Sequence, residues 1–188
     1  MSQYISVKKK ALKKEICEKI IDEIDNLERY ESLFKQEKDY YNGTSINIYD
    51  QFWCKNLFDC LVKYKKKHKF LDNKNHTRWE INPECNYQKY KPNQCYKSEH
   101  CEQGGTESDA RRMLVWMIYC NTIKKGGETN FPQQGLSIKP EQGTIVIWPA
   151  NWTHSHYGKP APKEHKYIIT GWACLLYTSD AADDLLCV

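Results

Sequence analysis

The sequence predicts a mainly β protein with N-terminal helices, an α+β chain in which a jelly-roll-like barrel is backed by helices. Two observations support this prediction. Helical periodicity is confined to roughly the first seventy residues, whereas after about residue 76 the chain consists of short, β-rich segments separated by Gly, Pro and Asn. Since no internal repeat follows, we expect a helical support region at 1–75 and the barrel core at 76–173, within one structural domain.

Two amphipathic helices are predicted ahead of the barrel. Between Ala11 and Tyr30, apolar residues recur every three or four positions among Lys and Glu, which gives one buried stripe. The stripe consists of Ile16, Ile20, Ile24 and Leu27. Residues 51–66 suggest a second helix, with Trp53, Leu57, Cys60, Leu61 and Tyr64 facing inward. The basic run at 63–69 is interpreted as a solvated helix face rather than a polyanion site.

Six strands are predicted in the second part of the chain, at 87–92, 94–102, 111–121, 135–143, 144–150 and 165–173. The segment at 111–121, RRMLVWMIYCN, is an apolar run rich in β-forming residues, which is typical of a central strand buried on both faces. The glycine-rich stretch KKGGETNFPQQG, between the third and fourth strands, is predicted to form a turn region.

Composition places the chain among ordinary globular proteins. Its 188 residues suffice for one domain with a substantial core, and the formal net charge of +4 is too small to indicate nucleic-acid binding. No apolar run has membrane-spanning length, and the start MSQYISVKKKALKKE lacks the apolar centre of a signal peptide. The 9 cysteines are irregularly spaced without a C-x-x-C pair, which fits a reducing compartment. We therefore expect a cytoplasmic protein without membrane attachment.

The end of the chain looks foreign to the rest. Residues 174–188 read CLLYTSDAADDLLCV, which resembles the translation of a transposase-type sequencing adapter. We therefore expect the natural sequence in this chain to stop near Ala173, with its true end missing. Residues 174–188 are excluded from fold prediction, as one excludes a fusion scar. The alternative is a genuine short C-terminal helix.

A histidine and a carboxylate stand two residues apart in SEHCEQGG, as His100 and Glu102. With 6 His and 24 Asp or Glu in the chain, one H-x-(D/E) pattern is expected by chance, so the motif alone means little. In an extended segment, however, side chains at i and i+2 leave on the same face. His100 and Glu102 would then both point into the barrel, with Cys101 directed to the core, and would supply two ligands of a 2-His-1-carboxylate Fe(II) site.

The third ligand is expected to be a histidine on a distant strand, and NWTHSHYG offers His154 and His156. Both can share one face of an extended segment, so alternation does not choose between them. The residues that follow favour His156, because Tyr157-Gly158 comes directly after it and Lys166 lies ten positions later, at the start of the last predicted strand.

Together these motifs resemble the Fe(II)/2-oxoglutarate-dependent dioxygenases, closest to the prolyl 4-hydroxylase type. The resemblance runs from about Gln88 to Trp172, about half of the chain. The matching residues, in order, are Tyr90, His100-Cys101-Glu102, Tyr119-Cys120-Asn121, the run GGETNF at 126–131, PEQG at 140–143, His156-Tyr157-Gly158 and Lys166. The chain departs from the commonest pattern in having Glu102 for Asp and YCN for YLN. Glutamate is one methylene longer but remains a hard oxygen donor.

The resemblance implies a double-stranded β-helix (jelly-roll) core and a role for each matching residue. His100, Glu102 and His156 would be the catalytic metal ligands. Lys166 would bind the far carboxylate of 2-oxoglutarate, since a buried ammonium without a partner is costly; the alternative is a lysine that reaches solvent. Tyr119 and Tyr90 match cosubstrate-binding positions, although each could equally be a core tyrosine.

The implied activity is hydroxylation dependent on Fe(II), 2-oxoglutarate and O2, with ascorbate as an optional cofactor. A protein or peptide is the expected substrate and a small molecule is the other option. Two alternatives are a catalytically inactive jelly-roll binding module and a nucleic-acid-modifying oxygenase of the same superfamily. The intact ligand candidates argue against the first, and the lack of interleaved aromatic residues in the basic run argues against the second. The sequence identifies neither the hydroxylated substrate nor the oligomeric state.

Overall fold

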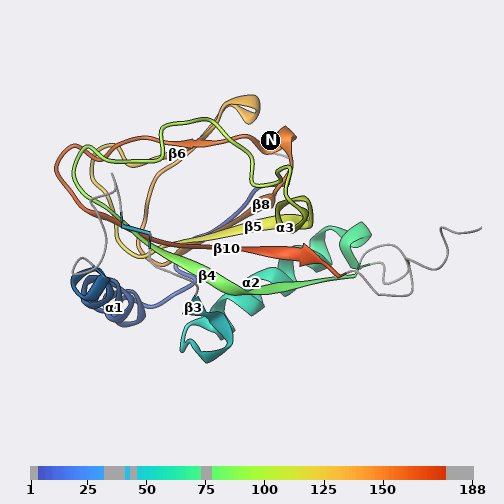
Figure 1. The fold of residues 1–188 in the computed structure, drawn as a ribbon, viewed down its shortest axis with the longest axis horizontal. Coiled ribbons are helices and arrows are strands. Elements are labelled where there is room, and N and C mark those ends of the chain that lie inside the picture. Colours follow the sequence, from blue (N-terminus) through green and yellow to red (C-terminus); the bar gives the residue numbers. More distant parts are fainter. Residues whose placement is uncertain (1–3, 32–40, 43–45, 73–77, 177–188) are drawn as a thin grey trace, which may run out of the picture.

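The computed structural model describes residues 4–31, 41–42, 46–72 and 78–176, and it places two facing β-sheets above a pair of helices (Figure 1). Among these residues, the larger sheet has the strand order β1-β8-β5-β10-β4-β2, with β3 also paired to β4. Its strands are β1 (Ser6–Lys8), β2 (Tyr41–Asn42), β3 (Ile46–Asn47), β4 (Trp79–Tyr90), β5 (Arg112–Tyr119), β8 (Thr144–Pro149) and β10 (Lys166–Leu175). The smaller sheet has the order β7-β6-β9, formed by β6 (Thr129–Phe131), β7 (Leu136–Ile138) and β9 (Tyr157–Gly158). The predicted class, mainly β with N-terminal helices, is confirmed.

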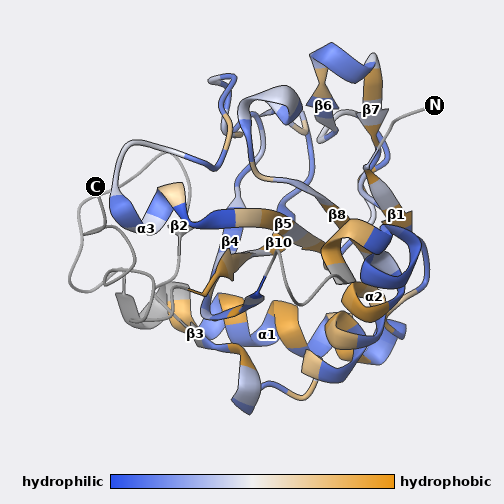
Figure 2. Ribbon diagram, turned by 90° about the vertical axis from the view of Figure 1, so that its right-hand side faces the viewer, coloured by the Kyte–Doolittle hydropathy of each residue, from blue (hydrophilic) through white to orange (hydrophobic). Residues whose placement is uncertain are grey.

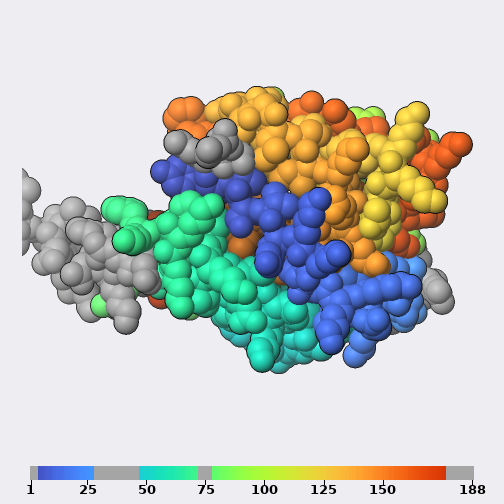
Figure 3. Space-filling model, turned by 180° about the vertical axis from the view of Figure 1, so that it is seen from behind, coloured from blue at the N-terminus to red at the C-terminus, as the bar shows by residue number. Residues whose placement is uncertain are grey.

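The two main helices, α1 (Lys14–Glu31) and α2 (Cys54–Lys67), cover one side of the larger sheet, and β6 and β7 lie on its other side (Figure 2). The predicted stripe of α1 is buried as expected, since Ile20 and Ile24 are fully enclosed while Ile16 and Leu27 pack at its margin. Seen from behind, α1, α2 and the N-terminal segment form much of the outer surface (Figure 3). None of the helices in the described ranges is both long and apolar enough to cross a membrane.

The sheet separates two apolar clusters because successive side chains of a strand point to opposite faces. On the helix side, Trp116 and Ile169 pack with Trp53 and other residues of the helical layer. On the side facing the smaller sheet, Val115 and Ile168 pack with a second set of buried residues. Strand β5 lies between β8 and β10, and its residues from Leu114 to Tyr119 are all buried, which confirms the predicted central strand.

Several predicted strand boundaries are wrong. Residues 94–102 do not form a strand; the only ladder contact there is an isolated bridge between His100 and His156. The predicted turn region contains β6, because Thr129–Phe131 pairs with both β7 and β9. Short helical turns are found at α3 (Glu107–Ala110) and at 48–50, 69–72, 132–134 and 152–154.

The structure describes only the beginning of the C-terminal segment that was interpreted as foreign, 174–188. Strand β10 continues to Leu175 and thus includes the first two residues of the segment interpreted as foreign, Cys174 and Leu175. Residues 177–188 lie outside the described part.

Candidate active site

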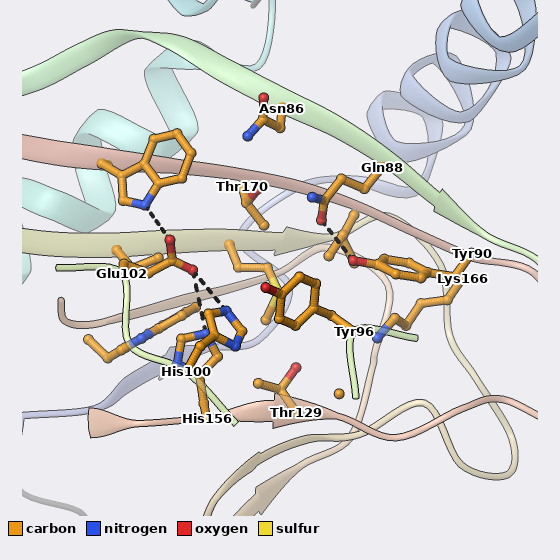
Figure 4. Close-up of a pocket in the computed structure, with 16 residues that line it drawn as sticks. Asn86, Gln88, Tyr90, Tyr96, His100, Glu102, Thr129, His156, Lys166 and Thr170 are labelled. Carbon is orange, nitrogen blue, oxygen red and sulfur yellow. Dashed lines mark hydrogen bonds and ion pairs between the residues drawn. The ribbon is translucent and has the colours of Figure 1, made fainter. Parts of the chain in front are cut away.

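A cavity of about 240 Å³ opens between the two sheets, and residues from both sheets and from the segment 96–102 line it (Figure 4). Strand β10 contributes alternate residues, since Lys166, Ile168, Thr170 and Trp172 all face the cavity. The polar groups lie at both ends, and apolar residues of β5 form part of the wall between them. The remaining lining residues are Asn86, Gln88, Tyr90, Tyr96, His100, Glu102, Val115, Met117, Thr129, Trp148, His156 and Gly158.

At one end, the structure brings together His100, Glu102 and His156, the three residues predicted as metal ligands (Figure 4). Glu102 Oε1 lies 3.4 Å from His100 Nε2 and 3.6 Å from His156 Nε2. One ligand atom of each residue lies within 4.8 Å of the other two. His154 is buried but outside this group, with its Nδ1 at 2.8 Å from Thr153 Oγ1.

Backbone contacts fix the two imidazoles. The chain bridges His100 and His156 directly, with His100 N donating to His156 O at 3.0 Å and His156 N donating to His100 O at 2.8 Å. The Nδ1 of His100 lies 2.9 Å from Ser98 O, and that of His156 lies 3.2 Å from His154 O. A carbonyl oxygen can only accept, so Nδ1 of each ring carries a proton, and Nε2 is the nitrogen that faces Glu102.

The electrostatics of this end favour an ionised carboxylate. Burial alone would raise the pKa of Glu102, but the hydrogen bonds from His100 and His156 hold it well below its usual range. Burial tends to lower the pKa of His100, and the hydrogen bond to Glu102 outweighs burial and raises it. The site therefore presents a negative oxygen beside two imidazole nitrogens, a donor set that a cation can satisfy.

The second oxygen of Glu102 is held by residues that the sequence interpretation did not place in the site. Trp172 Nε1 donates to Glu102 Oε2 at 3.0 Å, and Arg112 Nη1 lies 3.5 Å from the same oxygen. The Arg112 guanidinium contacts Glu102, Asp109 and the Trp172 ring. Alternation from Lys166 along β10 could have identified Trp172, because both residues face the same side of the strand.

Lys166 lies at the opposite end of the cavity from the three clustered residues (Figure 4). Its side chain is 4% exposed, so the alternative of a lysine that reaches solvent is wrong. Its Nζ donates to Gly127 O at 3.2 Å and lies 5.0 Å from the centre of the Tyr90 ring. Burial lowers the pKa of Lys166 to about 8. An ammonium held in this way gains from an anionic neighbour.

The two tyrosines predicted to bind cosubstrate occupy different layers. Tyr90 lines the cavity, and its hydroxyl donates to Gln88 Oε1 at 3.2 Å. Tyr119 is fully buried behind the wall and donates to Thr129 Oγ1 at 2.7 Å, and Thr129 faces the cavity instead. Burial raises the pKa of Tyr119, so this phenol remains a donor.

Aromatic rings enclose the histidines, and the sequence interpretation missed them. Tyr96 packs on His100 with ring centroids 4.3 Å apart, while Trp148 and Phe131 flank His156 at 5.1 and 5.5 Å. Cys101 is not part of the cluster, as expected, but it is partly exposed rather than in the core, and its Sγ donates to Gln103 O at 3.2 Å.

Comparison with known proteins finds similarity to one family. The family model described as the 2OG-Fe(II) oxygenase superfamily matches residues 85–174. Prolyl 4-hydroxylase subunit alpha-1 of Gallus gallus is 28% identical over 68 residues, which cover 32% of this chain and 13% of that protein. Probable prolyl 4-hydroxylase 3 of Arabidopsis thaliana is 26% identical over 111 residues, covering 45% of this chain and 38% of that protein. The chain thus matches well under half the length of these curated relatives.

Solved structures show the same fold. A prolyl-4-hydroxylase of Pseudomonas putida superposes with a TM-score of 0.68 at 17% identity, covering 93% of this chain and 95% of that one. A viral collagen prolyl hydroxylase from Paramecium Bursaria Chlorella virus-1, in a 2OG complex, gives 0.66 at 20% identity, with 93% and 97% covered. The predicted jelly-roll core is therefore confirmed.

Proposed function

We propose that this chain, whose residues 85–174 match the 2OG-Fe(II) oxygenase superfamily, is a prolyl 4-hydroxylase-like member of it that hydroxylates a protein or peptide, with proline as the leading target. Members of this superfamily use Fe(II), 2-oxoglutarate and O2. One observation carries the proposal for this chain: a cluster of two imidazoles and a carboxylate shares a cavity with a buried lysine at its far end. The two ends suit a metal ion and a diacid respectively.

The residues present fit the metal. Two imidazole Nε2 atoms and one ionised carboxylate oxygen converge, and a shared cation would replace the protons between them and bind all three. A 2-His-1-carboxylate set is typical of non-haem Fe(II) sites. We propose His100, Glu102 and His156 as the residues that hold the ion.

The residues at the other end fit a dicarboxylate. Lys166 offers a buried ammonium, and the carbonyl of Gly127 satisfies only one of its three donors. The hydroxyl of Thr129 faces the same cavity and is aligned by Tyr119, and the ring of Tyr90 covers the lysine. We propose that these residues hold the far carboxylate of 2-oxoglutarate, directly for Lys166 and Thr129 and indirectly for Tyr119.

When bound, the metal and cosubstrate supply the oxidising chemistry: O2 is consumed, 2-oxoglutarate becomes succinate and CO2, and one oxygen atom enters a C–H bond of the substrate. The protein's part is binding and orientation. His100 and His156 present Nε2 because their Nδ1 protons are engaged by backbone carbonyls. Val115, Met117 and Ile168 provide an apolar wall between the two polar ends, which limits water in the cavity.

The test is succinate release by the full chain with Fe(II), 2-oxoglutarate and O2 over a panel of proline-rich peptides, free amino acids and nucleic acids. We expect stimulation by a peptide, with a mass gain of one oxygen on proline. Stimulation by nucleic acid alone would support an oxygenase that modifies nucleic acid. Metal and cosubstrate binding without turnover on any substrate would favour a binding module.

Three further expectations stay proposals: stimulation by ascorbate, a cytoplasmic location, and a foreign origin of 174–188. We also keep 1–75 as the helical support region of the 76–173 core. Sequencing the 3′ end of the native transcript tests the origin of the tail; a message that encodes the same fifteen residues would contradict it.

A further inference from the structure

We propose that Trp172 and Arg112 are positioning residues for Glu102, which hold its outer oxygen so that this longer side chain serves where the family's commonest pattern has aspartate. The inference rests on the proposed metal site. The supporting observation is that the two oxygens of Glu102 have different partners. Oε1 faces both imidazoles (Figure 4), whereas Oε2 meets Trp172 and Arg112.

Trp172 makes the directional contact. Its indole N–H donates to Oε2 at 3.0 Å, an ordinary hydrogen-bond length, and the acceptor is a partly buried carboxylate. Trp172 is fixed on β10, where Gly171 and Ala173 on either side pair with β5. A rigid strand therefore sets where the outer oxygen lies.

Arg112 supports both partners. Its guanidinium lies 3.9 Å from the centre of the Trp172 ring, and Nη1 donates to the backbone carbonyl of Glu102 at 3.1 Å. Nη2 forms an ion pair with Asp109 at 2.9 Å, so the planar group is fixed from the other side. The 3.5 Å separation between Nη1 and Oε2 adds charge attraction to the hydrogen bond from Trp172.

Glutamate needs this support more than aspartate does. Its additional methylene adds a rotatable bond, so a carboxylate at the same backbone position can swing away from the imidazoles. The backbone of Glu102 is already fixed, since its N–H donates to Ala150 O at 3.0 Å. The remaining freedom is in the side chain, and fixing Oε2 leaves Oε1 pointing at the two Nε2 atoms. Groups that orient a metal ligand in this way commonly contribute tenfold or more to metal affinity.

The decisive variant is Trp172→Phe, which keeps an aromatic ring beside Arg112 and removes the N–H. We measure Co(II) binding by calorimetry and by the visible spectrum of the full chain, without 2-oxoglutarate or O2. We expect the Co(II) Kd to rise about tenfold. In a Glu102→Asp background we expect the same change to have less than about a twofold effect, because the shorter carboxylate cannot reach the indole and face the imidazoles together. Trp116→Phe is the matched control, since no described residue accepts from its Nε1 and it packs on the helix side.

Each outcome has a defined meaning. If the unmodified protein does not bind Co(II), the proposed function fails. If it binds and Trp172→Phe binds equally well, the positioning role is wrong and the proposed function stands. If Trp172→Phe weakens Co(II) binding by the same factor with Glu102 intact and in the Glu102→Asp background, Trp172 acts only through packing. This result would also overturn the inference. If Trp172→Phe melts early, Arg112→Gln replaces it, with about a threefold rise in Kd expected for Glu102 and none after Glu102→Asp.

Discussion

The two faces of strands β5 and β10 contain alternate residues of the same segments, yet they have opposite character. On the helix face, Trp116 fits so closely against Gly171 that a Cβ there would lie 2.2 Å from Trp116 Cζ2. On the other face, Lys166 and Thr170 line an open cavity. Dense packing therefore supports the fold from one side, which leaves the other side free to hold polar groups around a cavity. Substitutions on the cavity face should therefore change ligand binding and activity, whereas substitutions on the helix face should change the free energy of unfolding.

The largest effect is expected from His156→Ala on the cavity face. The anaerobic protein with Fe(II) and 2-oxoglutarate should develop a weak visible charge-transfer band, and this variant should lose both the band and succinate formation, because one of three ligands is removed. The melting temperature should change little. His154→Ala is the control: it lies outside the cluster and should retain the band. If His154→Ala loses the band and His156→Ala keeps it, the assignment of the third ligand is wrong.

Lys166→Ala tests the opposite end of the same cavity. Removing the ammonium should weaken 2-oxoglutarate binding about a hundredfold, the loss expected when one partner of a buried charge pair is deleted. Metal binding should be unchanged, since Lys166 is not part of the metal cluster. Calorimetric titration of the Co(II)-loaded protein with 2-oxoglutarate measures the affinity for 2-oxoglutarate. Equal affinity in the variant and the unmodified protein would remove Lys166 from the proposed site.

Gly171→Ala should affect stability alone. The added methyl group collides with the Trp116 ring, and overpacking of a core costs about 3 kcal/mol of unfolding free energy. Urea unfolding measures the loss, and Co(II) affinity of the folded fraction should remain. Gly105→Ala is the matched control because nothing lies within 4 Å of its Cβ. Similar unfolding free energies for the two variants would contradict the close fit inferred for the helix face.

Local patterns predicted the features that depend on local burial. The stripe of α1 and the central strand β5 follow from the spacing of apolar residues such as Ile20, Ile24 and Leu114. The order of motifs placed His100, Glu102 and His156 in one group, and the structure brings them together.

Features that depend on contacts between distant segments were missed. The segment 94–102 reads as a strand by composition, but its backbone bonds go to scattered positions such as Gly158, His156 and Ala150 rather than to a ladder. The contact of Trp172 with Glu102 joins residues 70 positions apart, which no local pattern encodes. Tyr119 shares a face of β5 with Val115 and Met117, but its hydroxyl contacts Thr129 of the smaller sheet, and Thr129 lines the cavity in its place.

The smallest predicted effect is a pH dependence confined to the lysine end of the cavity. Folding lowers the pKa of Lys166 from 10.5 to about 8, chiefly through burial, while nearby Cys95 and Glu128 act in the opposite direction. Below pH 8 the ammonium is present and 2-oxoglutarate affinity should be constant. Above pH 8 the folded protein without cosubstrate loses this proton, so the apparent Kd should rise, by about tenfold at pH 9.

In the Co(II)-loaded protein the metal end should not contribute to that change, because the Nε2 atoms of His100 and His156 would bind the ion and could not take up a proton. The pKa of Glu102 is lowered and its carboxylate is ionised throughout this range, and burial raises the pKa of the Cys95 thiol above 9.0. Lys166→Arg separates the two ends, because a guanidinium stays charged to well above pH 9. Its 2-oxoglutarate affinity, even if weaker overall, should be flat between pH 7 and 9 where that of the unmodified protein falls. Parallel declines in both proteins would assign the titration to another group and leave Lys166 fully charged over this range.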